Sequence, residues 1–268
     1  MNEILEKYKQ QLLARGLSLN YFYRMRIFLN FLEKKNLHYN SITQENVVQF
    51  LNEGKYNEQS KNSFINAGRD FYKFLGQENN EWTKLKLMKT EYKIPDYLSE
   101  QEIEKGISYL ITYYSKKIYP NKFRALIHFF FYTGARKEEV LNLKRTDFDF
   151  EKGSVKLFGK GKKERKSYYP DRVGKEIQEC FASEPEVSNA FNISIGKINY
   201  YVKKMGKHLN KNVFPHLLRH SGAREMLRKG IQLPEVSKIL GHTSLQTTLR
   251  YAELNEEERR EDYRKKMK

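Results

Sequence analysis

The first ninety residues place apolar side chains at the spacing of amphipathic helices. Four such stretches follow one another, over residues 4–13, 21–35, 47–51 and 58–75. Ser18 or Asn20 can begin the second stretch, and Thr43 stands where an N-cap residue is expected before the third. The pattern therefore predicts a small, all-helical N-terminal unit.

The helical pattern is interrupted after the fourth stretch. Gly76-Gln-Glu-Asn-Asn-Glu contains turn-forming residues, and Lys84–Pro95 is basic and lacks a helical period. Pro95 also disfavours a helix at the residue before it. We place an interdomain linker at roughly Asn79–Tyr97 and expect two domains, 1–94 and 95–268. The capping-box motif Ser99-Glu-Gln-Glu predicts that a helix opens the second domain.

The second domain combines two patterns of apolar residues, the alternation of β-strands and the spacing of α-helices. Between residues 148 and 167, Val155 and Leu157 alternate with polar neighbours. Gly159 and Gly161 supply a turn there, so a β-hairpin or small sheet is predicted. Helical spacing covers the stretches Arg124–Thr133, Glu138–Leu143, Val173–Phe181, Ile195–Asn210, His216–Lys229, Leu233–Leu240 and Ser244–Arg264. The predicted fold class is mainly α with a small β-sheet.

Composition adds a strong positive charge. The 268 residues include 50 Lys and Arg against 33 Asp and Glu, which gives a formal net charge of +17 and a pI near 9.6. Such a field attracts polyanions, most commonly nucleic acid, although a lysine-rich solvated surface would give the same balance. A membrane surface is the third alternative, but no basic amphipathic segment stands apart from the predicted fold.

Other features of the composition exclude several classes of protein. The single cysteine, Cys180, rules out a disulfide framework within the chain and is interpreted as a structural residue on a helix face. The N-terminus is charged throughout and lacks the apolar core of a signal peptide. The longest apolar run, Ala125–Tyr132, is too short to span a bilayer. We therefore expect a soluble, cytoplasmic protein.

Candidate chemistry begins in Thr133–Leu143, with the sequence TGARKEEVLNL. Gly134 is predicted to end one helix and Arg136 to open the next, where N-terminal amides favour anions. The alternative is that Arg136 is solvated, or paired with a carboxylate such as Glu139, as arginines at helix starts commonly are. Arg136 is a candidate anion-binding residue.

The turn of the predicted hairpin, Gly159-Lys-Gly-Lys-Lys-Glu-Arg, is the second segment of interest. Four basic residues can follow a phosphate backbone from such a turn: Lys160, Lys162, Lys163 and Arg165. The alternative is a solvated hairpin tip. The segment is not a P-loop, because it lacks the full glycine spacing and the Lys-Ser/Thr ending.

A third segment reads Pro215-His-Leu-Leu-Arg-His. Pro215 suits the first turn of a helix, and His216 and Arg219 are three apart and share a face. A zinc site formed by His216, His220 and His242 is an alternative. The Glu that follows the first His in metalloproteases is missing, however, and no cysteines support a structural site. We expect no metal, and we interpret His220 as packed under its own helix.

The fourth segment is Leu240–Tyr251. Gly241 and Thr243 bracket a turn, and a helix that begins near Ser244 carries Tyr251. The alternative is that Tyr251 is a core residue, as most of the 19 tyrosines must be.

Taken together and in this order, the four segments suit phosphoryl transfer at a phosphodiester. Two arginines can clamp the non-bridging oxygens with bidentate geometry and stabilise the charge of the transition state. A Lys can protonate the departing 5′-oxygen, and a His can assist proton transfer at the attacking hydroxyl. A Tyr hydroxyl, with a pKa of about 10, needs positioning and a base in order to attack. Such a step requires no metal ion or other cofactor.

These segments resemble the tyrosine recombinase (phage integrase) family, and most of all its compact Xer-type members. The signature segments cover Thr133–Tyr251, and the general layout covers nearly the whole chain. The resemblance implies a helical core-binding domain and a catalytic domain that clamp double-stranded DNA between them. Position by position, Arg136 is similar to the first catalytic arginine, Lys160 to the hairpin lysine that acts as general acid, His216 and Arg219 to the HxxR pair, His242 to the histidine of the LGH segment, and Tyr251 to the nucleophile.

The resemblance also implies a function. Family members are site-specific recombinases that cut and rejoin DNA through a 3′-phosphotyrosine, without metal or ATP, as a tetramer on two DNA sites. The charged end of the chain, 253–268, is similar to C-terminal helices that dock on a neighbouring subunit, or is simply a solvated helix. Two alternatives are a recombinase-derived DNA-binding protein without catalysis and a type IB topoisomerase. The complete set of six residues argues against the first, and the short two-domain chain against the second.

Overall fold

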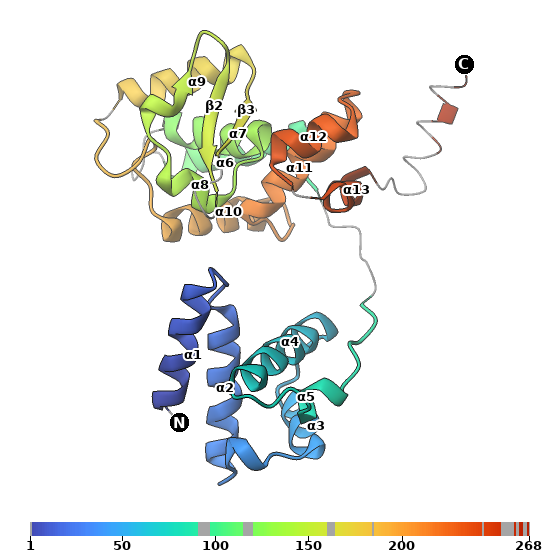
Figure 1. Cartoon of the computed structure of the whole chain (residues 1–268). Helices are drawn as coiled ribbons and strands as arrows, with labels where there is room; N and C mark the ends of the chain where they lie inside the picture. The colour runs from blue at the N-terminus through green and yellow to red at the C-terminus, as the bar shows by residue number, and fades with distance from the viewer. Residues whose placement is uncertain are drawn as a thin grey trace. The chain divides into compact units, whose positions relative to one another are not determined.

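The computed structural model describes residues 2–90, 97–114, 120–159, 164–183, 185–242 and 244–252, together with residues 260, 263, 264 and 267. The chain divides into two compact units, Met1–Tyr92 and Lys93–Lys268, and each is described by itself (Figure 1). Across the described ranges, no helix combines the length and the apolar character needed to cross a membrane.

The first unit is built from helices alone in its described residues. They are α1 (Asn2–Ala14), α2 (Asn20–Lys34), the 3₁₀ helix η1 (Tyr39–Ser41), α3 (Gln44–Glu53), α4 (Glu58–Phe74) and the short α5 (Glu81–Lys84). Thr43 is the N-cap of α3, and its Oγ1 accepts a hydrogen bond from the Asn46 backbone N–H at 3.3 Å. The predictions of a helical unit and of this cap are confirmed.

The predicted linker begins too early. Trp82, on α5, is fully buried, and its ring packs edge-on against Phe28 of α2 at 4.8 Å between centroids. The Asn62 side chain donates to the Met88 carbonyl at 2.9 Å and accepts from the Met88 N–H at 2.8 Å. Residues 79–88 therefore pack on the first unit. A four-residue helix carries no detectable period, so the sequence pattern could not reveal it.

The second unit surrounds a buried central helix, α7. Its elements are α6 (Glu100–Tyr114), α7 (Pro120–Thr133), α8 (Lys137–Asn142), the 3₁₀ helix η2 (Arg145–Asp147), β1 (Phe148–Asp149), β2 (Ser154–Phe158), β3 (Glu164–Tyr168), α9 (Asp171–Ala182), α10 (Ile195–His208), α11 (Pro215–Arg228), α12 (Leu233–Leu240) and α13 (Leu245–Ala252). Helix α7 contacts α6, α9, α11 and β3, and Phe129, Phe130 and Phe131 are buried within it. The predicted class, mainly α with a small sheet, is confirmed.

The small sheet is antiparallel, with the order β1-β2-β3. Val155 lies opposite Ser167, and Leu157 lies opposite Arg165. The predicted hairpin is therefore present, but its turn, residues 160–163, lies outside the described residues. The register matters for function because it turns Arg165 and Ser167 toward the end of α7, where both side chains bond to the Thr133 carbonyl.

Helix α11 approaches α7 closely because of a glycine. A Cβ on Gly222 would lie 1.7 Å from the Phe131 carbonyl oxygen, so only Gly fits at this crossing. The neighbouring Ser221 accepts a hydrogen bond from the Leu98 N–H at 2.9 Å, which ties the start of the described second unit to α11. The Ser-Gly-Ala stretch after His220 thus fixes the helix that carries the HxxR pair.

Helix boundaries agree with the predicted stretches to within a few residues through α12. At the start of α6, Ser99 and Glu102 form the predicted capping box, with hydrogen bonds of 3.2 and 3.0 Å. The predicted helix over Ser244–Arg264 is described only for α13 and a few later residues. Most of the charged end, 253–268, for which a docking helix and a solvated helix were the alternatives, lies outside the described residues.

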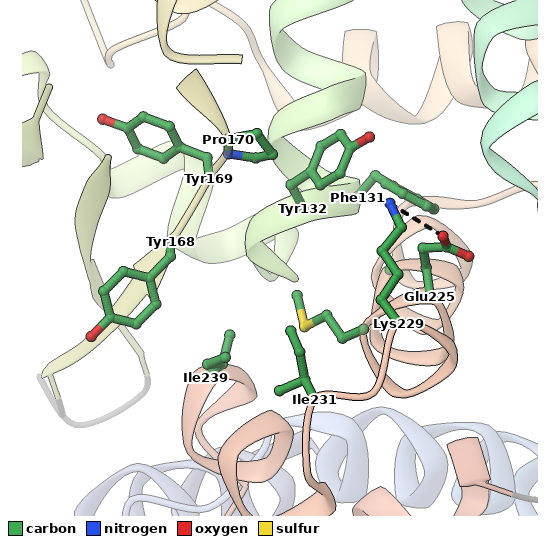
Figure 2. Close-up of a pocket in the computed structure, with 11 residues that line it drawn as sticks. Phe131, Tyr132, Tyr168, Tyr169, Pro170, Glu225, Lys229, Ile231 and Ile239 are labelled. Carbon is green, nitrogen blue, oxygen red and sulfur yellow. Dashed lines mark ion pairs between the residues drawn. The ribbon is translucent and has the colours of Figure 1, made fainter. Parts of the chain in front are cut away.

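An apolar hollow of about 280 Å³ opens between β3, α7, α11 and α12. Figure 2 shows Tyr132, Tyr168 and Ile239 around it, with the Lys229–Glu225 ion pair of 3.3 Å at its edge. Among the described residues, its lining includes none of the five predicted catalytic residues Arg136, His216, Arg219, His242 and Tyr251. The polar site described next is therefore separate from this hollow.

Candidate active site

Arg136 stands at the sharp turn between α7 and α8. Gly134 adopts φ +58°, a left-handed conformation that favours glycine, and Arg136 follows in extended conformation as the N-cap of α8. The Arg136 N–H donates to Glu139 Oε2 at 2.7 Å, and its Nη1 donates to Glu139 Oε1 at 2.9 Å. Its Nη2 donates to the Gly241 carbonyl at 3.2 Å, and 32% of the side chain is exposed. Arg136 is thus fixed on one side and open on the other.

Glu139 is the buried carboxylate of the site, with 1% of its side chain exposed. Arg165 binds both of its oxygens, through Nε at 3.2 Å and Nη2 at 2.7 Å. Burial alone would raise the pKa of Glu139, but hydrogen bonds and charge from Arg165, with those of Arg136, outweigh burial and lower it. Glu139 is therefore ionised at neutral pH.

Arg165 does not lie on a solvated hairpin tip. Only 8% of its side chain is exposed, and it also donates to the carbonyls of Gly134, at 3.1 Å, and Ile239. The expectation that it follows a phosphate backbone is wrong, as is the alternative of a solvated side chain. The strand register turns Arg165 inward. The sequence pattern could not show this, because glycines and charged residues together are also typical of an exposed turn.

Arg219 is the most deeply buried of the predicted residues, at 1% exposure. It donates to the carbonyls of Gly134 and Leu240, the latter at 2.7 Å, and its Nη2 lies 2.9 Å from His242 Nε2. Burial, followed by the positive charges of Arg136 and Arg165, lowers the pKa of Arg219 to about 9. The guanidinium keeps its proton at neutral pH, in surroundings that carry excess positive charge.

His242 has both ring nitrogens engaged. Because a guanidinium only donates, His242 Nε2 accepts from Arg219, and a neutral ring then carries its proton on Nδ1. Nδ1 lies 2.7 Å from Thr248 Oγ1, on α13. Burial, then Arg219 and Arg136, lowers the pKa of His242 to about 4, so the ring is neutral at pH 7. His242 therefore links Arg219 to the helix that carries Tyr251.

Tyr251 projects from α13 toward α11. It is 8% exposed, and its ring packs in a small cluster with Ala223, Val236 and Leu240. Its hydroxyl lies 2.8 Å from His220 Nδ1. The ring of Tyr251 is thus in a core while its hydroxyl faces a histidine, and its role as nucleophile remains a prediction. The expectation that His220 merely packs under its own helix is wrong.

His216 has a different position from Arg136, Arg219, His242 and Tyr251. His216 is exposed at the start of α11, and its ring meets His220 edge-on at 5.3 Å between centroids. Partial desolvation at the start of the helix, then the charges of Arg219 and Arg136, lowers the pKa of His216. Lys160 lies outside the described residues. The structure thus connects Arg136, Arg219, His242 and Tyr251 through direct or shared contacts, and brings His216 to them through His220.

The assembled groups suit an anion. Arg136 and Arg165 bind the carboxylate of Glu139, and Arg219 donates to the Gly134 carbonyl that Arg165 also binds, so these four side chains together carry two positive charges in excess. Preorganised, partly desolvated donors of this kind stabilise negative charge far better than water does. A phosphodiester beside the open side of Arg136 would offset this charge.

Histidines do not group here as metal ligands. Among the described residues, no set of three His, Cys, Asp or Glu side chains is placed to hold a metal ion. His220 faces Tyr251, while His242 faces Arg219 and Thr248. Two of the three histidines considered as zinc ligands, His220 and His242, therefore have other partners.

Sequence reasoning missed three participants: Arg165, His220 and Thr248. Arg165 gave a signal in its position beside the hairpin glycines, but its charge suggested the surface. His220 directly follows Arg219, and the sequence suggested for it only a metal ligand or a side chain packed under its own helix. Thr248 gave no signal, because a Thr inside a short polar helix is unremarkable.

Two arginines, histidines and a tyrosine, gathered on a helical unit with a small antiparallel sheet, define the class of tyrosine recombinases. The phage integrase family model matches residues 96–258, and the chain belongs to this family. It is a Xer-like site-specific recombinase, and neither the non-catalytic nor the topoisomerase alternative is favoured.

Similar proteins cover nearly the whole chain. The tyrosine recombinase XerC of Oceanobacillus iheyensis is 30% identical over 91% of this chain and 88% of its own length. The tyrosine recombinase XerA of Pyrococcus furiosus is 30% identical over 93% and 89%. The crystal structure of XerA recombinase matches with a TM-score of 0.57, 25% identity and 98% coverage of both chains. XerH site-specific recombinase, bound to its difH substrate, matches with a TM-score of 0.70 and 23% identity over 96% of this chain and 82% of that chain, which supports the fold.

Proposed function

We propose that this recombinase cleaves and rejoins double-stranded DNA at a specific site through a covalent 3′-phosphotyrosine at Tyr251. The observation that carries the proposal is a set of three contacts: Arg136 binds the Gly241 carbonyl, Arg219 binds the adjacent His242, and His242 contacts Thr248 on the helix of Tyr251. Segments more than a hundred positions apart in the chain converge there, at Arg136 and Gly241. A structural role alone gives no reason for so much positive charge beside a tyrosine hydroxyl.

Each residue has a role in the proposed reaction. Arg136 and Arg219 bind the non-bridging oxygens of the scissile phosphate, and His242 holds Arg219 in place. Lys160 protonates the 5′-oxygen as it leaves, a role that rests on the family resemblance. His216 lies at the exposed start of α11, where it contacts the bound DNA.

The bond changes balance without a cofactor. The Tyr251 oxygen gives up its proton to a histidine of the site and bonds to phosphorus, while the bond from phosphorus to the 5′-oxygen breaks and the departing oxygen takes a proton from Lys160. Rejoining reverses these steps when a 5′-hydroxyl attacks the phosphotyrosine. The phosphate stays esterified throughout, so ATP is not required, and the arginines and Lys160 supply the positive charge that a metal ion would otherwise provide.

Partners and domain roles complete the proposal. Residues 1–94 form a core-binding domain and 95–268 the catalytic domain, and a tetramer on two paired sites exchanges the strands. Structures of similar proteins support DNA as the partner, because XerH was solved with difH and a lambda integrase dimer with a COC′ core site. The net charge of +17 is suited to contacts along the phosphate backbone.

The test uses the protein with DNA in EDTA. Tyr251→Phe is used first to select bound duplexes from sheared genomic DNA of the source organism, since this variant keeps the binding surface. Wild-type protein is then mixed with the selected duplexes and denatured in SDS. A protein–DNA adduct with wild type, and none with Tyr251→Phe, supports the proposal. Specifically bound duplexes without an adduct would favour a DNA-binding protein without catalysis.

A further inference from the structure

The hydroxyl of Tyr251 has a histidine neighbour outside the six residues of the proposed machinery. His220 Nδ1 lies 2.8 Å from it, and the two ring centroids are 5.1 Å apart. The contact joins residues 31 positions apart, on α11 and α13. His220 directly follows Arg219, so the helix that presents the phosphate-binding arginine also presents this ring.

The other two histidines of the site are less suited to take a proton from Tyr251. His242 accepts from Arg219 at Nε2 and faces Thr248 at Nδ1, and its ring centroid lies 5.9 Å from that of Tyr251. Protonating Nε2 would break its contact with Arg219, because both groups would then be donors. His216 packs edge-on against His220, with ring centroids 5.3 Å apart.

The surroundings of His220 keep its ring neutral. His216 and Arg219 face it from α11, His242 from the turn after α12, and Tyr251 from α13. Burial, then His216 and Arg219, lowers the pKa of His220 to about 4. A neutral ring can accept at Nδ1 when its proton is on Nε2. A bound phosphodiester brings negative charge to Arg219, which opposes this lowering and strengthens the base when DNA is present.

We propose that His220 is a further catalytic residue, which accepts the phenolic proton of Tyr251 at Nδ1 during cleavage and returns it during rejoining. This inference rests on the proposed function of Tyr251 as nucleophile. As the tyrosine oxygen bonds to phosphorus, its proton moves to His220, and the electron pair of the breaking bond leaves with the 5′-oxygen. That oxygen takes a separate proton from the general acid, so His220 serves only the nucleophile side.

The test compares His220→Asn with wild type in single-turnover cleavage. Asn can place its amide oxygen near the Nδ1 position, but it cannot take a full proton at neutral pH. Cleavage is expected to fall by about 10²-fold or more, with DNA affinity unchanged. His208→Asn, an exposed histidine at the end of α10, is the matched control and should cleave normally.

Two further changes, one in the protein and one in the DNA, distinguish a base from a group that only positions the ring of Tyr251. Replacing Tyr251 with difluorotyrosine lowers the pKa of the nucleophile, so it should restore much of the activity of His220→Asn. A 5′-bridging sulfur in the substrate removes the need for a general acid, so it should rescue Lys160→Ala and leave His220→Asn slow. His220→Gln is carried in parallel, with thermal melting, in case the Asn variant folds poorly.

Contrary outcomes point to different failures. Folded His220 variants that cleave at the wild-type rate overturn the inference and leave Tyr251 as nucleophile. If the 5′-sulfur substrate rescues His220→Asn, then His220 acts on the leaving group. If difluorotyrosine does not rescue it, then His220 only positions Tyr251. Either result overturns the role of His220 as the base. A wild-type protein without any adduct overturns the inference together with the proposed function.

Discussion

Glu139 and Arg165 form a bidentate ion pair, with two N···O distances of 3.2 and 2.7 Å between helix α8 and strand β3. The pair is buried on both sides, and Arg136 shares the same carboxylate. The hairpin is thereby held against the turn that carries the first candidate phosphate-binding arginine. This arrangement makes Glu139 the counter-charge of the whole cluster.

Glu139→Gln should therefore destabilise the second unit. Removing one partner leaves the buried Arg165 without a counter-charge, and such losses cost about 3 kcal/mol or more. Urea unfolding followed by circular dichroism measures this change. The control is Glu138→Gln, the adjacent carboxylate with 63% of its side chain exposed, which should change the free energy of unfolding by less than about 0.5 kcal/mol. Equal effects of the two variants would contradict the role assigned to Glu139.

The two arginines should be needed for cleavage. Arg136→Ala or Arg219→Ala removes donors aimed at the phosphate, and we expect adduct formation to slow by about 10²-fold or more. Quenched single-turnover assays measure the rate, with thermal melting to verify the fold of the buried Arg219 variant. Arg228→Ala, on the same helix as Arg219 but with 69% of its side chain exposed, is the control. Near-normal rates for Arg136→Ala would remove that residue from the site.

Stability should fall in mild acid. The pKa values of His220 and His242 are lowered to about 4, whereas an unfolded His titrates near 6.5. Between these values the unfolded chain binds protons that the folded chain does not, so the free energy of unfolding decreases as pH falls from about 6.5 to about 4. Urea midpoints measured across this range should show the decline. The double variant His220→Asn/His242→Asn should have a flatter profile, and an unchanged slope would show that other groups cause it.

Gly222→Ala should destabilise the helix crossing of α11 and α7. Its new methyl group would meet the Phe131 carbonyl oxygen, and overpacking of this kind costs about 1–3 kcal/mol. Gly196→Ala is the matched control, because a Cβ there meets nothing within 4 Å, near the start of α10. The control should be neutral or slightly stabilising, since Ala is the better helix former. Similar melting temperatures for both variants would mean that α11 can shift away at little cost.

The sequence by itself determined the elements and most of the chemistry. Periods of 3.6 and 2 follow from backbone geometry, so the helices, the hairpin and caps such as Ser99 could be predicted from local pattern. The residue types in four short segments indicated phosphoryl transfer and the recombinase family, which the family match confirms. Roles of the six individual residues remain proposals.

Only the tertiary structure decided which side chains meet. The strand register turned Arg165 inward, burial of Trp82 assigned residues 79–88 to the first unit, and the approach of α13 to α11 brought Tyr251 to His220. Each depends on packing between segments distant in the chain, whereas a periodic pattern reports only which face of a single element is apolar. Hydrogen-bond partners such as His220 and Tyr251 are fixed by that packing, because neither residue type specifies its partner locally.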